Sequence, residues 1–320
     1  MLKLPQKVKV VEVGPRDGLQ SFHRWVDTDV KVAMIDRLSA AGFPMIEATS
    51  FARPSVVPHL KDAELVLARI QRRPGTAYRA LVPNAKGAER AVASGLVDEL
   101  LGLITVSETY LAHNQNMTLD RAIAEGIRAF EIAAARNIGF TMALGMAMWC
   151  PYEGRVPEAN ALAVLGRFWD AGLRRFYFAG SVGMEDPAHV HTLFRMAHER
   201  HPGIELGYHV HNVPGFGVAN VLAALDAGAS FLEGSICGVG GGIAMPTNMG
   251  AVGNLPTEDI VHLLNSCGIS TGIDTAQVLA CAREIGEMLD MEPLSHLSHC
   301  GTREELLART SGQAFQHPGR

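Results

Sequence analysis

The sequence has few of the features that mark disulfide-rich or membrane-spanning proteins. Its five cysteines form no C-x-x-C pair, which argues against a disulfide framework and against a cysteine-based zinc site. The stretch before Val8 lacks an apolar core of signal-peptide length, and no later segment offers the roughly 18 uninterrupted apolar residues of a spanning helix. We therefore expect a soluble, cytoplasmic protein without a membrane partner.

A large excess of charge of one sign is also missing. The chain has 28 Lys and Arg against 33 Asp and Glu, a formal charge of -5, and no long run of either sign. This balance predicts no basic surface for nucleic acid or for an anionic membrane. An anionic substrate would have to be bound by a few local groups. The 320 residues, 48% of them hydrophobic, suffice for one large domain with a sizeable core.

What the sequence does contain is a loose repeat. An amphipathic stretch ends at a small residue and a glycine, and a β-branched or apolar run follows. The glycines are Gly42, Gly95, Gly172 and Gly228. Each unit is typical of a helix, its C-terminal glycine and a buried parallel strand. Residues from Val30 to Ala41 support this interpretation, because their apolar side chains recur at three- and four-residue spacing.

Eight segments have the apolar character of strands. They are Val8–Val13, Met45–Thr49, Tyr78–Val82, Glu99–Val106, Thr141–Met148, Arg175–Ala179, Leu206–His211 and Phe231–Cys237. Strands that alternate with helices over about 240 residues favour a single (β/α)₈ barrel (TIM barrel), with a doubly wound open sheet as the alternative. We assign residues 1–270 to the barrel. Residues 271–320 would form a C-terminal helical extension of the same domain, with a helix over Thr275–Leu289 and a polar tail.

Unusual polar residues gather at the predicted C-terminal strand ends, where such barrels carry their active sites. The first strand leads into Arg16, Asp17 and Gln20, a cation, a carboxylate and an amide in one turn. The seventh ends with His209 and His211, which point to the same face because side chains alternate along a strand. If that face is the interior, they and Asp17 would bind a metal ion. The alternatives are hydrogen-bonded core histidines and an aspartate that only structures its turn.

His189 and His191 have the same spacing but follow Asp186 and Pro187, which are typical of a helix start. Such residues diverge around a helix, so we assign them no metal role. Two imidazoles with carboxylate and amide oxygens suit Mg²⁺ or Mn²⁺, and the set is also compatible with Zn²⁺ or Co²⁺. The glycine run at 238–242 does not fit the G-x-G-x-x-G nucleotide pattern, and we expect a loop that covers the site.

Six motifs occur in order between about Val8 and Gly272. They are VEVGPRDGLQ (Val11–Gln20), MIEATSF (Met45–Phe51), PNAKG (Pro83–Gly87), CPYEG (Cys150–Gly154), HVHN (His209–Asn212) and GNLPTED (Gly253–Asp259). Together they resemble the 3-hydroxy-3-methylglutaryl-CoA (HMG-CoA) lyase family of metal-dependent barrel enzymes. The resemblance implies a TIM barrel, a carbon–carbon lyase activity, a divalent metal ion and an acyl-CoA or hydroxy-acid substrate.

The resemblance also implies roles at the matching positions. The metal ligands would be Asp17, His209, His211 and Asn254, of which Asn254 is assigned through the resemblance alone. The catalytic residues would be Arg16, which stabilises an enolate oxygen, Asp17 and Glu47. The substrate-binding residues would be Glu12, Gln20, Ser50, Tyr177, Ser181 and Gly242. For Glu47 and Ser50 the alternative is ordinary hydrogen bonding at a strand end.

Departures from the family pattern fall on the acid–base and acyl-recognition side of the site. The lyases carry a cysteine in a GLGGCP-like loop, the expected proton donor or acceptor, where this chain has Gly242. They carry an aspartate in a GDT-like turn, where alignment on Gly183 places Gly180. Tyr177 stands where a serine is expected, and Asn212 replaces an aspartate after the second histidine.

Three functions are therefore open at this point. The first is a lyase acting on a 3-hydroxyacyl-CoA such as HMG-CoA, or on a related β-hydroxy acid, with Cys237 or an ordered water protonating the enolate. The second is an aldolase or Claisen-type synthase acting on a 2-oxo acid or another acyl-CoA, because the altered positions reshape the pocket. The third is a catalytically silent paralogue that binds a metabolite or a partner, which the intact ligand set disfavours. We also expect a homodimer or higher homo-oligomer.

Overall fold

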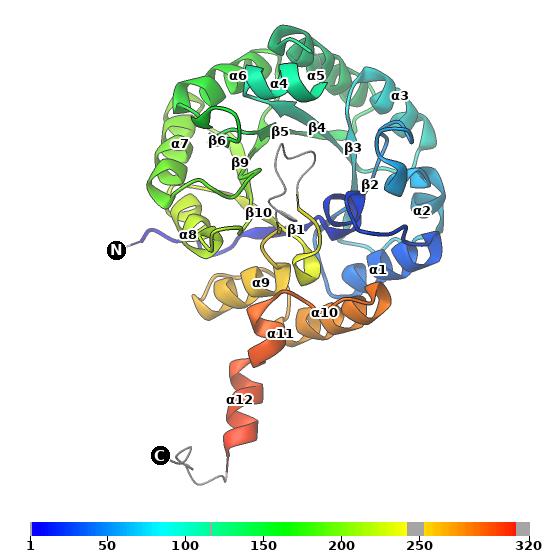
Figure 1. Cartoon of the computed structure of the whole chain (residues 1–320), viewed down its shortest axis with the longest axis vertical. Helices are drawn as coiled ribbons and strands as arrows, with labels where there is room; N and C mark the ends of the chain where they lie inside the picture. The colour runs from blue at the N-terminus through cyan, green and yellow to red at the C-terminus, as the bar shows by residue number, and fades with distance from the viewer. Residues whose placement is uncertain (1, 116, 242–252, 312–320) are drawn as a thin grey trace.

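The computed structural model describes residues 2–115, 117–241 and 253–311. Within them, eight parallel strands close into a barrel (Figure 1). They are β1 (Lys9–Glu12), β2 (Met45–Ser50), β3 (Ala77–Val82), β4 (Glu99–Thr105), β5 (Gly139–Gly145), β8 (Arg175–Ala179), β9 (Glu205–His209) and β10 (Phe231–Gly234). A small antiparallel ribbon, β6 (Trp149–Cys150) and β7 (Gly154–Arg155), follows β5. The predicted barrel is confirmed, and the open-sheet alternative is wrong.

Helices surround the barrel (Figure 1). They are α1 (Thr28–Ala40), α2 (Ala63–Arg69), α3 (Ala85–Ser94), α4 (Glu108–Gln115), α5 (Leu119–Ala134), α6 (Glu158–Asp170), α7 (Pro187–Arg200), α8 (Gly217–Asp226) and α9 (Thr257–Ser266). Short helical turns are η1 (Gly14–Gly18), η2 (Pro58–Leu60) and η3 (Ile236–Gly238). Local sequence explains their ends: the Asp186 carboxylate accepts a hydrogen bond from the His189 amide at 2.9 Å and begins α7 ahead of Pro187, as predicted.

The expected strands all overlap observed ones, but five of the eight run past the observed C-terminal end. The second expected strand stops one residue early, at Thr49, and the third and sixth end where expected. The last strand stops at Gly234, so the prediction that Cys237 belongs to it is wrong: Cys237 lies in η3 with φ of 60°. The chain leaves the barrel here because the Ser235 amide donates to the Leu255 carbonyl at 3.2 Å. The Cys237 amide then donates to the Glu258 carboxylate at 3.2 Å. These bonds turn the chain towards the segment before α9.

The barrel interior holds charged side chains as well as apolar ones. Its apolar part consists of Val11, Val13, Met45, Leu81, Leu101, Ala143, Tyr177, Ala179 and Phe231. Because side chains alternate along a strand, four buried charged residues lie on the same inward faces. They are Glu47, Arg79, Glu99 and Glu233. A larger apolar core fills the space between strands and helices.

After α9 come α10 (Thr275–Leu289), which packs on α1 and α9, then α11 (His296–Cys300) and α12 (Arg303–Thr310). The predicted helix over Thr275–Leu289 is confirmed. The helix α12 projects away from the barrel and has no buried residue (Figure 1). The domain boundary at residue 270 stays a prediction. None of the helices in the described ranges is long and apolar enough to span a bilayer.

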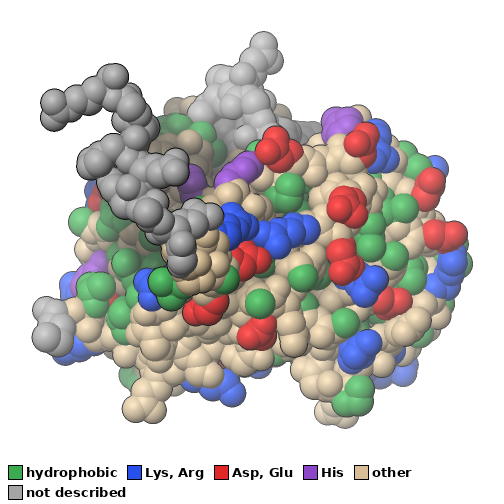
Figure 2. Space-filling view, turned by 90° about the horizontal axis from the view of Figure 1, so that it is seen from below, with side chains coloured by type: hydrophobic (Ala, Val, Ile, Leu, Met, Phe, Trp, Pro, Cys, Tyr) green, Lys and Arg blue, Asp and Glu red, His purple; other side chains and the backbone are tan. Residues whose placement is uncertain are grey.

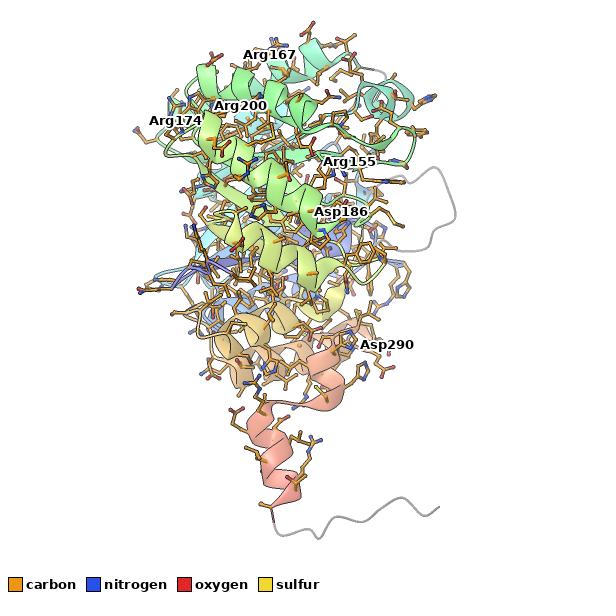
Figure 3. The ribbon with its side chains drawn as sticks, turned by 90° about the vertical axis from the view of Figure 1, so that its left-hand side faces the viewer. Arg155, Arg167, Arg174, Asp186, Arg200 and Asp290 are labelled. Atoms are coloured by element: carbon orange, nitrogen blue, oxygen red, sulfur yellow. The ribbon has the colours of Figure 1, made fainter. Side chains whose placement is uncertain are left out.

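The two ends of the barrel can be followed in the side view (Figure 3). Arg155 and Asp186 lie towards the right of this view, at the end where the strands finish, and Arg174 and Arg200 lie towards the left. Seen from below, the surface of the molecule carries acidic and basic side chains interspersed with one another (Figure 2). Because barrels of this kind carry their active sites at the C-terminal ends of the strands, we look for the functional site at that mouth.

Gly207 on β9 offers a test of the packing inside the barrel. A Cβ at this position would lie 2.2 Å from Cε2 of the buried Phe231 ring. We expect Gly207→Ala to lower the free energy of unfolding by about 1–3 kcal/mol, measured by urea denaturation, because the ring must shift. Gly166→Ala on α6 is the control, since nothing lies within 4 Å of its Cβ position. That variant should gain up to about 1 kcal/mol from helix propensity. Wild-type stability of Gly207→Ala would contradict the packing described.

Candidate active site

The turn after β1 brings two charged side chains to the barrel mouth. In η1, the amides of Arg16 and Asp17 both donate to the Val13 carbonyl, at 3.1 and 2.7 Å. Glu12 fixes the turn, because its Oε1 accepts from the amides of Gly14 at 2.7 Å and Ile236 at 2.9 Å. A Cβ on Gly14 would lie 2.7 Å from that oxygen, so the close approach requires glycine.

Arg16 is 3% exposed and held on several sides. Its Nε donates to Glu47, and its Nη1 donates to Asp17 Oδ1 at 2.8 Å and to Gln20 Oε1 at 3.4 Å. Gln20 Nε2 also donates to Asp17 Oδ1, at 3.0 Å. Burial alone would lower the pKa of Arg16, but the charges of Glu47 and Asp17 outweigh it and raise the pKa above its usual value. The guanidinium is therefore fixed and permanently charged.

Glu47 owes its place to an irregularity in β2. The register with β3 shifts between Glu47 and Thr49, so that Ala48 is an extra residue opposite the partner strand. Such bulges re-aim a side chain next to a site. Glu47 is completely buried and binds Arg16 with one oxygen and Arg79 with the other.

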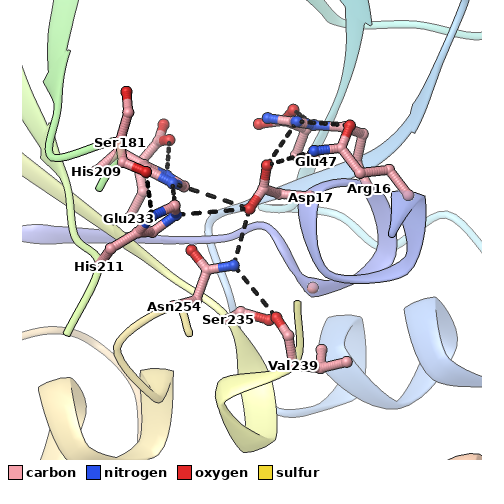
Figure 4. Close-up of polar contacts among 12 residues, drawn as sticks. Arg16, Asp17, Glu47, Ser181, His209, His211, Glu233, Ser235, Val239 and Asn254 are labelled. Atoms are coloured by element: carbon pink, nitrogen blue, oxygen red, sulfur yellow. Dashed lines mark hydrogen bonds and ion pairs between the residues drawn. The ribbon is translucent and has the colours of Figure 1, made fainter. Parts of the chain in front are cut away.

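The two histidines converge on Asp17 (Figure 4). The Nε2 atoms of His209 and His211 are 3.0 Å apart, and they lie 3.9 and 4.0 Å from Asp17 Oδ2. Each Nδ1 has its own acceptor: Glu233 Oε2 at 3.3 Å for His209 and the Ser181 carbonyl at 2.9 Å for His211. A neutral imidazole that donates from Nδ1 keeps its lone pair on Nε2. Both Nε2 atoms therefore face the region in front of Asp17.

The electrostatics of the cluster follow from burial and from these neighbours. Burial and the nearby His209 lower the pKa of His211 to about 4, so its ring is neutral at neutral pH. Burial would lower the pKa of His209, but Glu233 and Asp17 outweigh it and raise that pKa. Burial would raise the pKa of Asp17, but Arg16 and the two histidines lower it to about 2. Asp17 is thus an anion at neutral pH.

Asn254 completes the cluster from the segment before α9. Its backbone pairs with that of His211, and its Nδ2 donates to Asp17 Oδ2 at 2.8 Å and to the Val239 carbonyl at 3.2 Å. Its Oδ1 is buried and has no hydrogen-bond partner among the described residues. Asn254 was expected here only from the resemblance, because its residue type gives no signal by itself.

These residues fit a divalent cation. Among the residues that the structure describes, Asp17, His209 and His211 form the group able to hold a metal, with ligand atoms within 4.8 Å of one another. Two ligands at right angles and about 2.1 Å from an ion are about 3.0 Å apart, which matches the two Nε2 atoms. Without a cation, one Nε2 would donate a hydrogen bond to the other, so a bound ion would take the place of that proton. The orphaned Asn254 oxygen adds a fourth donor.

The predicted substrate-binding residues lie at different depths. Tyr177 is buried inside the barrel, with its ring stacked on that of His209 at 5.8 Å between centroids. Ser181 is at the mouth, where its Oγ accepts from the Met146 amide at 3.0 Å. Gln20 is partly exposed beside Asp17. These three positions border the cluster, and their contact with substrate stays a prediction.

Glu12, Ser50 and Gly242 differ from them. Glu12 follows the inward-facing Val11, so it faces out of the barrel, where it holds backbone amides. Ser50 is buried, and its Oγ accepts from the Ala52 amide at 3.1 Å, which is the strand-end hydrogen bond considered as the alternative. Gly242 lies outside the described residues. The substrate roles of all three stay predictions.

Gly180 leaves space that another carboxyl group occupies. Glu185 Oε1 lies 1.9 Å from the position that a Cβ on residue 180 would take. It accepts a hydrogen bond from the Tyr208 hydroxyl at 2.6 Å, and burial raises the pKa of Glu185. Where the family pattern has an aspartate, this chain thus has a glycine backed by a buried glutamate. That glutamate bonds Tyr208 rather than any member of the metal cluster.

The remaining histidine pair is separated as predicted. His189 is buried on α7, with Nε2 3.5 Å from Glu158 Oε1. His191 points to another neighbour, with Nε2 3.2 Å from Asp226 Oδ2. The i, i+2 spacing on a helix therefore sends the two rings in different directions.

Cys237 lies away from the metal cluster. Its Sγ donates to the Ala282 carbonyl on α10 at 3.1 Å, and burial raises the pKa of the thiol. Its surroundings include two buried acids: burial raises the pKa of Glu258 to about 8 and that of Glu12 to about 7. The structure therefore does not place Cys237 to protonate a substrate at the metal cluster.

Two residues of the site were missed from the sequence. Glu233 holds His209, and Arg79 binds both Glu233, at 2.7 Å, and Glu47. The available signal was a charged residue within an apolar run, in AYRALV for Arg79 and FLEG for Glu233. A charge buried in a strand is stable only with a partner, and the partner is distant in the sequence.

Several known proteins similar to this chain are hydroxymethylglutaryl-CoA lyases. A family model described as HMGL-like matches residues 7–285. Mitochondrial hydroxymethylglutaryl-CoA lyase of Mus musculus is 37% identical over 295 residues, covering 92% of this chain and 90% of the relative. Cytoplasmic 3-hydroxy-3-methylglutaryl-CoA lyase of Rattus norvegicus is 34% identical over 276 residues, covering 86% and 79%. An Acinetobacter baumannii HMG-CoA lyase structure, in complex with coenzyme A and 3-methylmalate, has a TM-score of 0.87 and 32% identity, with 98% of each chain covered.

The packing of Gly180 against Glu185 can be tested with a double-mutant cycle. We expect Gly180→Ala and Glu185→Ala each to destabilise the protein by about 1–3 kcal/mol, the first by overlap and the second by loss of the Tyr208 bond. The double variant should be more stable than the sum predicts, by about 0.5–3 kcal/mol, because the shorter side chain removes the overlap. Strict additivity in urea denaturation would contradict the contact.

Glu258 predicts a pH dependence of stability. Its pKa rises from an ordinary value of 4.5 to about 8 on folding, so the folded protein holds a proton that the unfolded chain releases. The free energy of unfolding should therefore fall as pH rises from about 4.5 through about 8. In Glu258→Gln the free energy of unfolding should fall less over this range. Compared with the wild type, the variant should therefore be relatively more stable at pH 8 than at pH 5. Parallel profiles from urea denaturation at both pH values would refute this.

Proposed function

The chain belongs to the HMGL-like family of carbon–carbon lyases, and from this premise we propose that it cleaves HMG-CoA or a closely related 3-hydroxyacyl-CoA at a divalent metal site. The observation that carries the proposal is the convergence of the His209 and His211 Nε2 atoms on Asp17, with both Nδ1 atoms already committed to acceptors. We assign Asn254 as the fourth ligand because its buried Oδ1 has no other partner among the described residues. Mg²⁺ or Mn²⁺ is the proposed ion.

The protein residues divide the reaction between them. A bound divalent ion would lower the pKa of the substrate's tertiary hydroxyl and offset the charge on a neighbouring carboxylate or carbonyl oxygen. Asp17 is the ionised side chain placed to accept the hydroxyl proton. As that proton leaves, the hydroxyl carbon becomes a carbonyl, and the electrons of the broken carbon–carbon bond pass to the thioester carbonyl as an enolate. Arg16 would stabilise the enolate oxygen with its fixed guanidinium, and an ordered water would protonate the enolate carbon to give the thioester product.

Arg16 is suited to this task by its surroundings. Glu47 holds its Nε, and Asp17 and Gln20 bind its Nη1. A pre-oriented cation in a nearly water-free site stabilises developing charge without reorganisation at the moment of reaction. Glu47 therefore acts on the reaction through Arg16, as a positioning residue.

The acyl group is the part of the substrate most open to variation. Gly242 replaces the loop cysteine of the family pattern, and Gly180 with Glu185 replaces its aspartate. A positioned acid–base group typically contributes about 10²–10⁴-fold to the rate, so we expect slow turnover of HMG-CoA. The same departures favour the second candidate, an aldolase or Claisen-type synthase that acts on a 2-oxo acid or another acyl-CoA.

We also propose a homodimer or higher homo-oligomer in the cytoplasm. Self-association is supported by α12, which has no buried residue and exposes Leu306 and Leu307 at 54% and 69%. A monomer mass in light scattering of the purified protein would contradict self-association. The proposed location follows that of the cytoplasmic relative, whereas the mouse relative is mitochondrial. Fractionation of the source cells would test it directly.

The experiment that tests the proposed function combines metal binding with turnover. The wild type should bind one Mn²⁺ per chain and convert HMG-CoA to acetyl-CoA and acetoacetate only when the ion is present. His211→Ala should lose both properties, because it removes a ligand. His191→Ala is the matched control, since His191 has the same H-V-H spacing but lies on α7 and faces Asp226. It should keep both the stoichiometry and the rate.

Other results would change the assignment. Unchanged Mn²⁺ stoichiometry in His211→Ala would contradict the metal site. Metal binding without cleavage of HMG-CoA or any other 3-hydroxyacyl-CoA would contradict the lyase. A metal-dependent product from a 2-oxo acid, tested with and without acetyl-CoA, would then favour the second candidate. Turnover near that of a lyase with the loop cysteine would contradict the expected rate loss.

A further inference from the structure

We infer that Arg79 is a positioning residue that joins the two halves of the metal-binding site. The inference rests on the proposed function, because it concerns the same site. Arg79 belongs to β3 and is completely buried, and its hydrogen bonds go to Glu47 and Glu233 rather than to Asp17 or the histidine rings. It acts on them through two carboxylates.

Arg79 Nη2 donates to Glu233 Oε1 at 2.7 Å and also to Glu47 Oε2. The second oxygen of each carboxylate faces the site: Glu47 Oε1 accepts from Arg16, and Glu233 Oε2 accepts from His209 Nδ1. One nitrogen atom thus lies at the junction of two hydrogen-bond paths. One path ends at the proposed enolate-binding cation and the other at a proposed metal ligand.

The two paths start on strands that are not neighbours. β1 lies between β2 and β10 in the barrel order, so Glu47 and Glu233 are not on adjacent strands. Their strands pair with β1 and not with each other, and Arg79 adds a direct side-chain link between the two carboxylates. Its guanidinium carbon lies 5.8 Å from the centroid of the Tyr177 ring, which itself stacks on His209.

Buried carboxylates need such a link. Glu47 and Glu233 are both completely buried, and an ionised carboxylate in that environment is strongly destabilised without a partner. A planar guanidinium offers several donors in fixed directions, which a lysine ammonium does not. Groups that orient a metal-binding histidine typically contribute about 10–100-fold to metal affinity. We expect Arg79 to contribute on this scale through Glu233.

Arg175 provides a matched control in the same set of interior charges. It donates to Glu99 and, at 2.8 Å, to Glu205, and Glu99 Oε1 lies 3.8 Å from Arg79 Nη1. Arg175 precedes Tyr177 by two residues on β8, lies further from the metal cluster and has no hydrogen bond to Glu47 or Glu233. Loss of its guanidinium removes the ion pairs with Glu99 and Glu205 and leaves the bonds of Arg79 to Glu47 and Glu233 in place.

The experiment compares Arg79→Lys with Arg175→Lys in metal-free, full-length protein. Both variants keep the charge, so a difference reports orientation rather than net charge. Mn²⁺ affinity, followed by electron paramagnetic resonance of the free ion, should fall about 10–100-fold in Arg79→Lys and change less than about twofold in Arg175→Lys. Circular dichroism would show that each variant is folded before titration.

Arg79→Met is the second variant, in case the lysine variant does not fold. If Arg79 acted only through its charge, Arg79→Lys would bind Mn²⁺ like the wild type, and Arg79→Met would bind it more tightly because the site loses a positive charge. Either result would overturn the inference, as would equal losses in Arg79→Lys and Arg175→Lys. Absence of His211-dependent Mn²⁺ binding in the wild type would instead contradict the proposed metal site, and the inference with it.

Discussion

Buried charge is the constraint on which the site depends. Arg16, Asp17, Glu47, Arg79 and Glu233 are each at most 6% exposed. An ion withdrawn from water is costly unless an opposite charge and hydrogen bonds replace its hydration. Each carboxylate in this set is bonded to at least one guanidinium or imidazole, and the bonds run from Arg16 through Glu47 and Arg79 to Glu233. Local features of the chain, such as the bulge in β2 and the turn η1, bring the groups together.

This arrangement leaves several potential ligand atoms facing one region. The Nε2 atoms of His209 and His211 are 3.0 Å apart, and the Asn254 Oδ1 is buried with no hydrogen bond from the described residues. Because most buried polar atoms in proteins are paired, the unpaired Asn254 oxygen beside two imidazoles favours a bound ligand. A divalent cation satisfies all of them at once. The charge network therefore supports metal binding, because it fixes the positions of the atoms that the ion would contact.

The fold could be predicted because its signals are local. Gly42 and the other helix-ending glycines mark the repeat, and each expected strand overlaps an observed one. The alternation of His209 and His211 likewise needs only their own strand. Strand ends were less predictable: the chain leaves the barrel before Cys237 because the Ser235 amide bonds Leu255 and the Cys237 amide bonds Glu258, which lie about one element further along the chain.

The parts of the site that could not be predicted depend on distant partners. Arg79 and Glu233 are 154 positions apart, and a single sequence gives no sign that they bond. Asn254 was found through a family resemblance, because an asparagine next to glycine is more often a turn residue. Glu185 fills the space beside Gly180, yet its sequence neighbours suggest only a loop. In each case the sequence shows an unusual residue and the structure supplies the reason for it.

The metal site can be located in a crystal of the protein soaked with Mn²⁺, with anomalous scattering to identify the ion. We expect one strong peak bonded to His209 Nε2, His211 Nε2, an oxygen of Asp17 and Asn254 Oδ1, at roughly 2.0–2.3 Å from each. The His209 Nδ1 bond to Glu233 should persist, as should the link through Arg79. A peak elsewhere would contradict this metal site. So would an ion that is bonded neither to Asn254 nor to both histidines.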